Sequence, residues 1–146
     1  MTDTLQEQPA VEELTAQDQL QQLISERTGQ FEINMDYADL KWVRNSLEKA
    51  EFKGSNEAYL VVTSILSIDQ ILKSMDPKST ESHTITLDAT VIETINFFLN
   101  RHSGKGLESA RRLFIAAMKF RTTMEKISNL DKSIEKLNAE IKSDKK

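Results

Sequence analysis

The chain contains no cysteine, only four glycines and two prolines, and its aromatic content is 6%. The absence of cysteine excludes disulfide bonds, thiolate nucleophiles and sulfur ligands for zinc, and it is compatible with a reducing compartment. So few aromatic residues do not indicate a surface on which nucleic-acid bases stack. We therefore expect a cytoplasmic protein that uses no metal and no cofactor.

Long apolar runs are also missing. No stretch approaches the roughly 18–20 apolar residues that a membrane span requires. Residues 1–10 have neither the basic start nor the apolar run of a signal peptide. We expect neither a signal peptide nor a membrane partner.

The remaining composition is that of one globular domain with tails. Its 146 residues are 38% hydrophobic and 29% charged, with a mean hydropathy of −0.47. The net charge of −4 hides a segregation of charge along the chain. Residues 1–26 carry six carboxylates and no Lys or Arg, whereas residues 99–121 carry six Lys or Arg against Glu108 alone. Both segments are consistent with ordinary solvated surface, and the basic one is also consistent with a phosphate-binding face.

The most informative feature is an internal repeat with an offset of 52 residues, the separation of Asp36 and Asp88. The residues that are identical in the two copies fall where secondary structure is expected to start or end. Apolar residues in one copy also align with apolar residues in the other, which indicates two copies of one unit. The identical pairs are Ile33 and Ile85, Asp36 and Asp88, Leu47 and Leu99, Lys53 and Lys105, Gly54 and Gly106, and Ala58 and Ala110.

Each copy predicts a short strand followed by two helices. Alternation over 30–35 predicts the strand, Asp36 predicts a helix cap, and Lys53-Gly54 predicts the turn between the helices. The second helices are the most apolar, and we expect them at the centre of the core, with Val62, Leu66 and Phe114 among the core residues. The fold class is therefore mainly α: two duplicated strand-helix-helix units that form a four-helix core, with a small two-stranded β element and a long C-terminal helix.

The domain organisation follows from this interpretation. We expect a disordered acidic arm over 1–10, an N-terminal helix over 11–28, and a single helical domain over 30–128. That domain consists of two repeats, 30–76 and 82–128, joined by a polar linker that starts at Asp76-Pro77. A C-terminal helical extension covers 129–146, so that one helix from 107 to about 142 is roughly 54 Å long.

An apolar stripe runs along this C-terminal helix beyond the end of the second repeat. Its Ile and Leu residues alternate at spacings of three and four, a pattern that favours a parallel two-stranded coiled coil. We predict an interface with a second copy, most simply in a dimer, or with an unknown protein. The alternative is that the stripe packs against the chain's own N-terminal helix. The five interface residues are Ile127, Leu130, Ile134, Leu137 and Ile141.

The turn before the last helix is a second candidate site. A helix N-terminus with glycines and cations nearby can bind an anion, so a nucleic-acid or nucleotide phosphate is a possible ligand. The spacing of a P-loop is absent, and the other repeat has the same turn, which equally indicates a plain connection between helices. The candidate phosphate-binding residues are Arg101, Lys105, Gly106, Arg111 and Arg112.

Nothing in the sequence indicates catalysis. His83 and His102 lie in polar loops and belong to no triad or metal-binding spacing. We predict a non-enzymatic, self-associating adaptor or regulatory protein that binds a protein partner through its C-terminal helix. The alternative is a nucleic-acid or nucleotide-phosphate binding protein that uses the basic segment 101–121.

Overall fold

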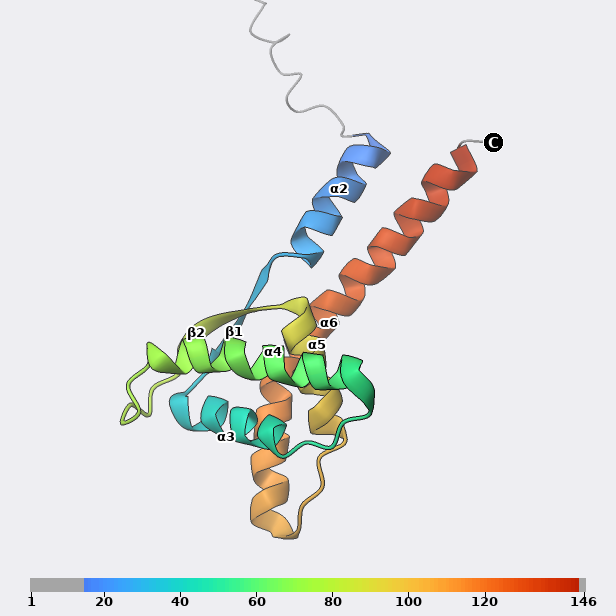
Figure 1. Ribbon diagram of the computed structural model, residues 1–146. Helices are drawn as coiled ribbons and strands as arrows, with labels where there is room; N and C mark the ends of the chain where they lie inside the picture. Colours follow the sequence, from blue (N-terminus) through green and yellow to red (C-terminus); the bar gives the residue numbers. More distant parts are fainter. Residues whose placement is uncertain (1–14, 145–146) are drawn as a thin grey trace, which may run out of the picture.

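The computed structural model describes residues 15–144 and consists mostly of helices (Figure 1). The expected fold class is confirmed: two strand-helix-helix units, a small two-stranded sheet and a long C-terminal helix. The acidic arm over 1–10, the first part of the helix over 11–28 and the last two residues lie outside the described residues. The elements are α2 (Ala16–Arg27), β1 (Gln30–Met35), α3 (Tyr37–Glu48), α4 (Gly54–Lys73), β2 (His83–Asp88), α5 (Ala89–Asn100) and α6 (Gly106–Asp144).

Equivalent residues of the two repeats start equivalent helices. The carboxylate of Asp36 accepts a bond from the backbone N–H of Asp39 at 2.7 Å, and that of Asp88 accepts one from Val91 at 2.9 Å. Both caps satisfy N–H groups that have no partner inside the helix. Gly54 and Gly106 begin α4 and α6 with φ of 76° and 87°, a conformation that a side chain disfavours.

The two strands form an antiparallel ribbon whose register carries the symmetry of the repeat. Ile33 pairs with Ile85, its own equivalent 52 residues later. A pseudo-two-fold axis therefore passes between these two residues. It exchanges the Phe31–Leu87 pair with the Met35–His83 pair on the other side.

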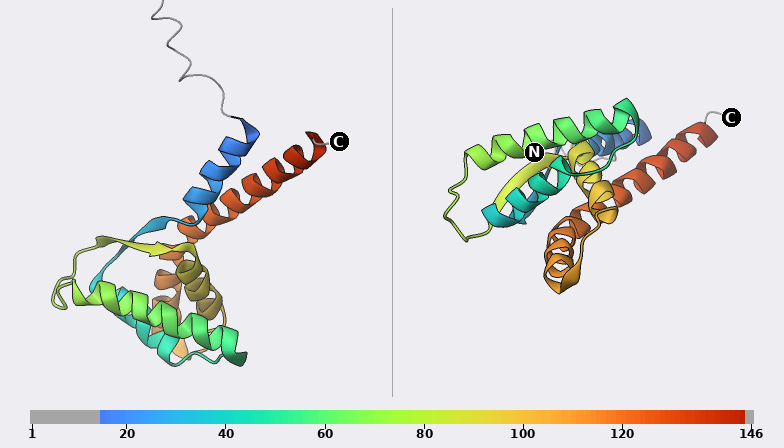
Figure 2. Two further views of the ribbon diagram at one scale, coloured as in Figure 1. Left: turned by 45° about the horizontal axis from the view of Figure 1, so that its top comes forward. Right: turned by 60° about the horizontal axis from the view of Figure 1, so that its bottom comes forward.

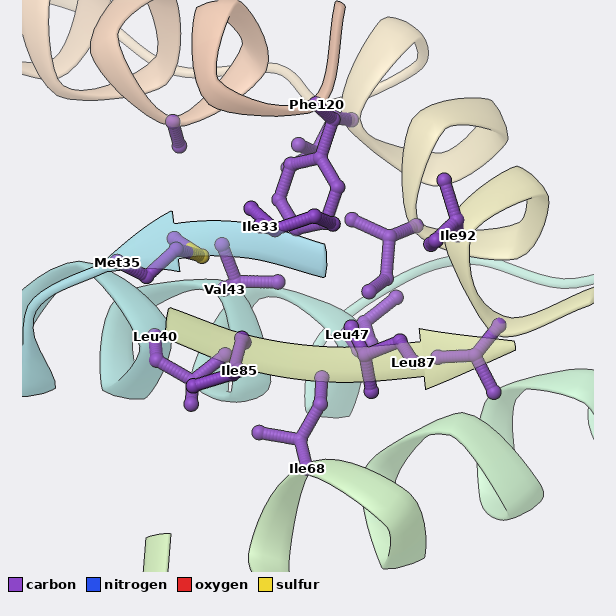
Figure 3. Close-up of a cluster of buried hydrophobic side chains, with 14 of the residues drawn as sticks. Ile33, Met35, Leu40, Val43, Leu47, Ile68, Ile85, Leu87, Ile92 and Phe120 are labelled. Carbon is purple, nitrogen blue, oxygen red and sulfur yellow. The ribbon is translucent and has the colours of Figure 1, made fainter. Parts of the chain in front are cut away.

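The hydrophobic core lies beneath this ribbon. Side chains from both strands meet residues of α3, α4, α5 and α6, as the close-up in Figure 3 shows. The most completely buried large side chains include Met35, Leu40, Ile68, Ile92 and Phe120. No residue of α2 belongs to this cluster, so the two repeats close the core by themselves.

The C-terminal half of α6 leaves the body of the protein together with α2 (Figures 1 and 2). The first half of α6 contributes Ala116, Phe120 and Ile127 to the core. Beyond it, α2 packs against α6, and the two helices run in opposite directions. We call α2 together with residues 127–144 of α6 the stalk.

The second helices contribute to the core with one side only, which corrects the expectation that Val62, Leu66 and Phe114 are core residues. Val61, Ile68 and Leu72 of α4 are buried, but Val62 and Leu66 are 55% and 60% exposed. Phe114 of α6 is 64% exposed. The reason is that α4 packs against α3 and α5 on one side only, so its remaining apolar side chains face outward.

Candidate interaction surfaces

The predicted C-terminal stripe lies along the stalk, where α2 covers part of it. Leu137 is 8% exposed, and Leu130, Ile134 and Ile141 are half-buried, whereas Ile127, at 1% exposed, belongs to the core of the body. On the α2 side, Leu20 is buried at 8%. The packing against the N-terminal helix, which the sequence left open as an alternative, is thus present for this part of the stripe.

Arg27 fastens α2 at the base of the stalk. Its Nε lies 2.7 Å from an oxygen of Asp131 on α6, and its Nη2 lies 3.1 Å from one of Glu93 on α5. The bond to Asp131 raises the pKa of Arg27 above its usual value, burial opposes this, and Glu93 adds to it. The sequence analysis did not identify Arg27, although it is the first cation after 26 residues without one.

The outer side of the stalk remains partly uncovered. Leu130, Ile134 and Ile141 keep intermediate exposure, and Ile24 of α2 is 37% exposed. A surface hollow of about 470 Å³ lies at the base of the stalk, where α2, β1 and α6 meet, and Leu130 lines it. Because α2 leaves these apolar side chains partly accessible, this side of the stalk can accept another helix.

The basic residues 101–121 do not converge on one point. Arg101 contacts Glu57 at 3.4 Å and lies over the ring of Phe97, close to the C-terminal end of α3. Arg112 reaches the other end of α3, where its Nη2 donates to the carbonyl of Ala38 at 2.9 Å. Two of the predicted phosphate-binding residues, Arg101 and Arg112, therefore lie at opposite ends of α3.

Carboxylates of the same chain already neutralise several of these cations. Asp39 is 7% exposed, and its oxygens lie 3.6 Å from Arg112 and 3.1 Å from Lys119. Glu57 accepts a bond from the backbone N–H of Lys53, which, with Arg101, lowers the pKa of its carboxyl. Lys105 and Gly106 are exposed at the start of α6, and Arg111 makes only a long contact of 3.8 Å with Glu108.

Two exposed apolar faces were missed by the sequence analysis. The face on α4 consists of Tyr59, Val62 and Leu66, which are 67%, 55% and 60% exposed. The face on α6 includes Phe114 and Met118, which are 64% and 42% exposed. These two are the repeat equivalents of Val62 and Leu66. Exposed apolar clusters of this kind mark interaction surfaces in folded proteins.

Comparison with known proteins found no matching family model, no matching curated protein and no matching solved structure. Among residues 15–144, no three His, Asp or Glu side chains are placed so that they share a metal ion. None of the helices formed by these residues is long and apolar enough to cross a membrane.

Proposed function

We propose that this protein is a non-enzymatic, self-associating adaptor or regulatory protein that binds a second copy, and a protein partner, through its C-terminal helix. The observation that carries this proposal is the half-covered stripe on the stalk, with Leu130, Ile134 and Ile141 still accessible. A cytoplasmic location, expected from the cysteine-free sequence, is part of the same proposal.

The geometry of the stalk supports association better than an isolated role. A helix that lies outside a core gains its stability from packing of its apolar side, and here only one short helix provides that packing. Two stalks placed side by side would form a four-helix arrangement in which the stripe faces the interior. Of the stripe residues, Ile127 belongs to the core cluster and the other four do not, so association through Leu130, Ile134 and Ile141 requires no rearrangement of the body.

The basic segment gives less support to a phosphate ligand. Arg101, Arg112 and Lys119 all have carboxylate partners within the chain. An anion would have to displace these partners, and the separated positions of Arg101 and Arg112 prevent both from contacting one phosphate. We therefore place the function on the stalk.

Light scattering on the full chain tests the proposal, and a mass that is a multiple of 16.6 kDa is expected. Replacing Ile134 and Ile141 by Lys should remove the association that depends on the stalk and lower the measured mass. Both residues are half-buried, so the Lys stems can lie along the helix while their charges remain in water. Leu137 is left unchanged because it is buried within the stalk.

A matched control carries Ala139→Lys and Ser143→Lys, which add the same charge at exposed positions of the same helix. This variant should keep the mass of the unaltered chain. The proposal would be contradicted if the variant with Ile134→Lys and Ile141→Lys had the same mass as the control. Circular dichroism must show in both that the helix content is unchanged.

A further inference from the structure

The apolar face on α4 has an unusual composition for an exposed helix surface. Residues 58–68 contain no charged side chain, yet Tyr59, Val62 and Leu66 are each more than half exposed. These three residues recur at spacings of three and four and therefore lie on one side of the helix. The nearest charge on this side is Asp69, one turn beyond Leu66, with about a third of its side chain exposed (35%).

The face on α6 has the same apolar centre but opposite charges. Phe114 and Met118 form the centre. Arg111 lies one turn before them and Arg121 one turn after, and both are exposed. Arg121 lies directly beside this face, with 3.6 Å between its Nη1 and the sulfur of Met118. A surface hollow of about 480 Å³ between α5 and α6 adjoins the face, and Phe114, Met118 and Arg121 line it.

The two faces match in length when the helices are placed antiparallel. Tyr59 and Asp69 are ten residues apart, as are Arg111 and Arg121, which is about 15 Å in each helix. The register that sets Leu66 opposite Phe114 also sets Val62 opposite Met118. In the same register Asp69 lies opposite Arg111, and Tyr59 lies opposite Arg121.

Each pair in that register is favourable. The central pairs bury apolar surface, with the thioether of Met118 against Val62. The end pairs are an ion pair between Asp69 and Arg111 and a cation–π contact between Arg121 and Tyr59. Asp69 already accepts a bond from Arg44 at 2.9 Å within its own chain, so Arg111 adds to an existing contact and does not replace it.

We infer that the α4 face of one copy packs antiparallel on the α6 face of a second copy, as an interface distinct from the stalk. The chain itself supplies both complementary surfaces. Pairing of two α6 faces would bring Arg111 near the Arg121 of the other copy, and pairing of two α4 faces would leave both α6 faces uncovered. The unlike pairing covers both apolar faces and balances their charges.

This contact has a consequence for the size of the assembly. It joins different surfaces of the two copies, so each copy in a pair still has one face free. Association through these faces therefore continues beyond a dimer, either into a closed ring or into an open filament.

A pair of opposite charges placed across this interface tests the inference. Leu66→Lys and Phe114→Glu change one face each, and both positions are exposed, so the fold tolerates either charge. Each variant alone should weaken self-association roughly tenfold or more, because an unpaired charge enters an apolar contact. An equimolar mixture should regain association, because the unaltered α4 face of one variant can pair with the unaltered α6 face of the other, and at the second contact the introduced lysine lies opposite the introduced glutamate.

The measurement is light scattering over a concentration series in a chain that also carries Ile134→Lys and Ile141→Lys, so that the stalk does not contribute. Thr80→Lys, at an exposed position in the loop between α4 and β2, is the matched control and should behave as its parent. A parent that stays monomeric at every concentration would overturn the inference. So would single variants that associate as the parent does, or a mixture that gains nothing over its components. None of these outcomes changes the result for the stalk, which is measured separately in the chain with both faces intact.

Discussion

At the scale of single residues, Ser64 stands out because its hydroxyl is buried without a hydrogen-bond partner. The residue is 1% exposed on α4. Its equivalent in the second repeat is Ala116, which is also 1% exposed. The same position in the fold therefore accepts a methyl group, and a buried polar group without a partner costs free energy.

We predict that Ser64→Ala stabilises the protein by about 0.5–1 kcal/mol, since it removes the unsatisfied hydroxyl and improves helix propensity. Urea unfolding followed by circular dichroism measures this change. Ser67→Ala, at a half-buried position of the same helix, is the control for propensity alone and should give a smaller gain. A loss of stability in the Ser64 variant would show that the hydroxyl has a partner, such as a buried water.

At the scale of elements, the attachment of α2 depends on few interactions. Leu20 is the only buried residue of this helix, and the ion pairs of Arg27 connect its C-terminal end to α5 and α6. Because the pKa of Arg27 is raised, its guanidinium stays charged at every pH below the usual pKa of arginine. Its contribution is therefore fully present across the physiological range and declines only in strong alkali.

Replacing Arg27 by Gln should loosen α2 without unfolding the body. The partners Glu93 and Asp131 are 41% and 49% exposed, so we expect a loss of only about 1 kcal/mol, or roughly fivefold faster amide exchange in α2. Hydrogen exchange resolved by segment measures this. Lys132→Gln removes an exposed cation from the same stalk and should leave exchange in α2 unchanged. Faster exchange in the ribbon as well would mean that α2 supports the core.

Sequence patterns predicted the elements well where the cause is local. The caps at Asp36 and Asp88, the turns at Gly54 and Gly106, and the strand alternation each depend on residues within a few positions. The sequence predicted a two-stranded element but not its register, in which Ile33 pairs with Ile85. The outward position of Val62 and Phe114 was not predictable, because periodicity shows that a residue is apolar but not which surface covers it.

For the candidate site, too, sequence patterns predicted what depends on nearby residues and not what depends on distant ones. The stripe from Ile127 to Ile141 was recognisable from its spacing, and the structure shows how α2 covers one side of it. Arg27 gave no pattern, because its two partners are 66 and 104 residues away in sequence. Long-range ion pairs of this kind depend on the assembled fold, which one sequence alone does not reveal.

At the scale of the whole molecule, the core and the stalk are separable. The hydrophobic cluster of the body contains residues of both strands and of α3 to α6, and none of α2. The pseudo-two-fold axis relates the two repeats within the body, whereas α2 and the distal part of α6 have no counterpart in the first repeat. The stalk is thus an addition to a symmetric unit that is complete without it.

Removing residues 1–28 should therefore leave the body folded and uncover the part of the stripe that lies beyond Ile127. Without α2, Leu137 loses its cover inside the chain, and the Ile and Leu spacing favours pairing with the same helix of another copy. We predict self-association roughly tenfold tighter than that of the full chain, measured by light scattering over a concentration series. Thermal unfolding of the truncated chain should keep one cooperative transition. A monomer that loses about two to three turns of helix by circular dichroism, in addition to the helix removed with α2, would show instead that the stripe needs α2 and no second copy.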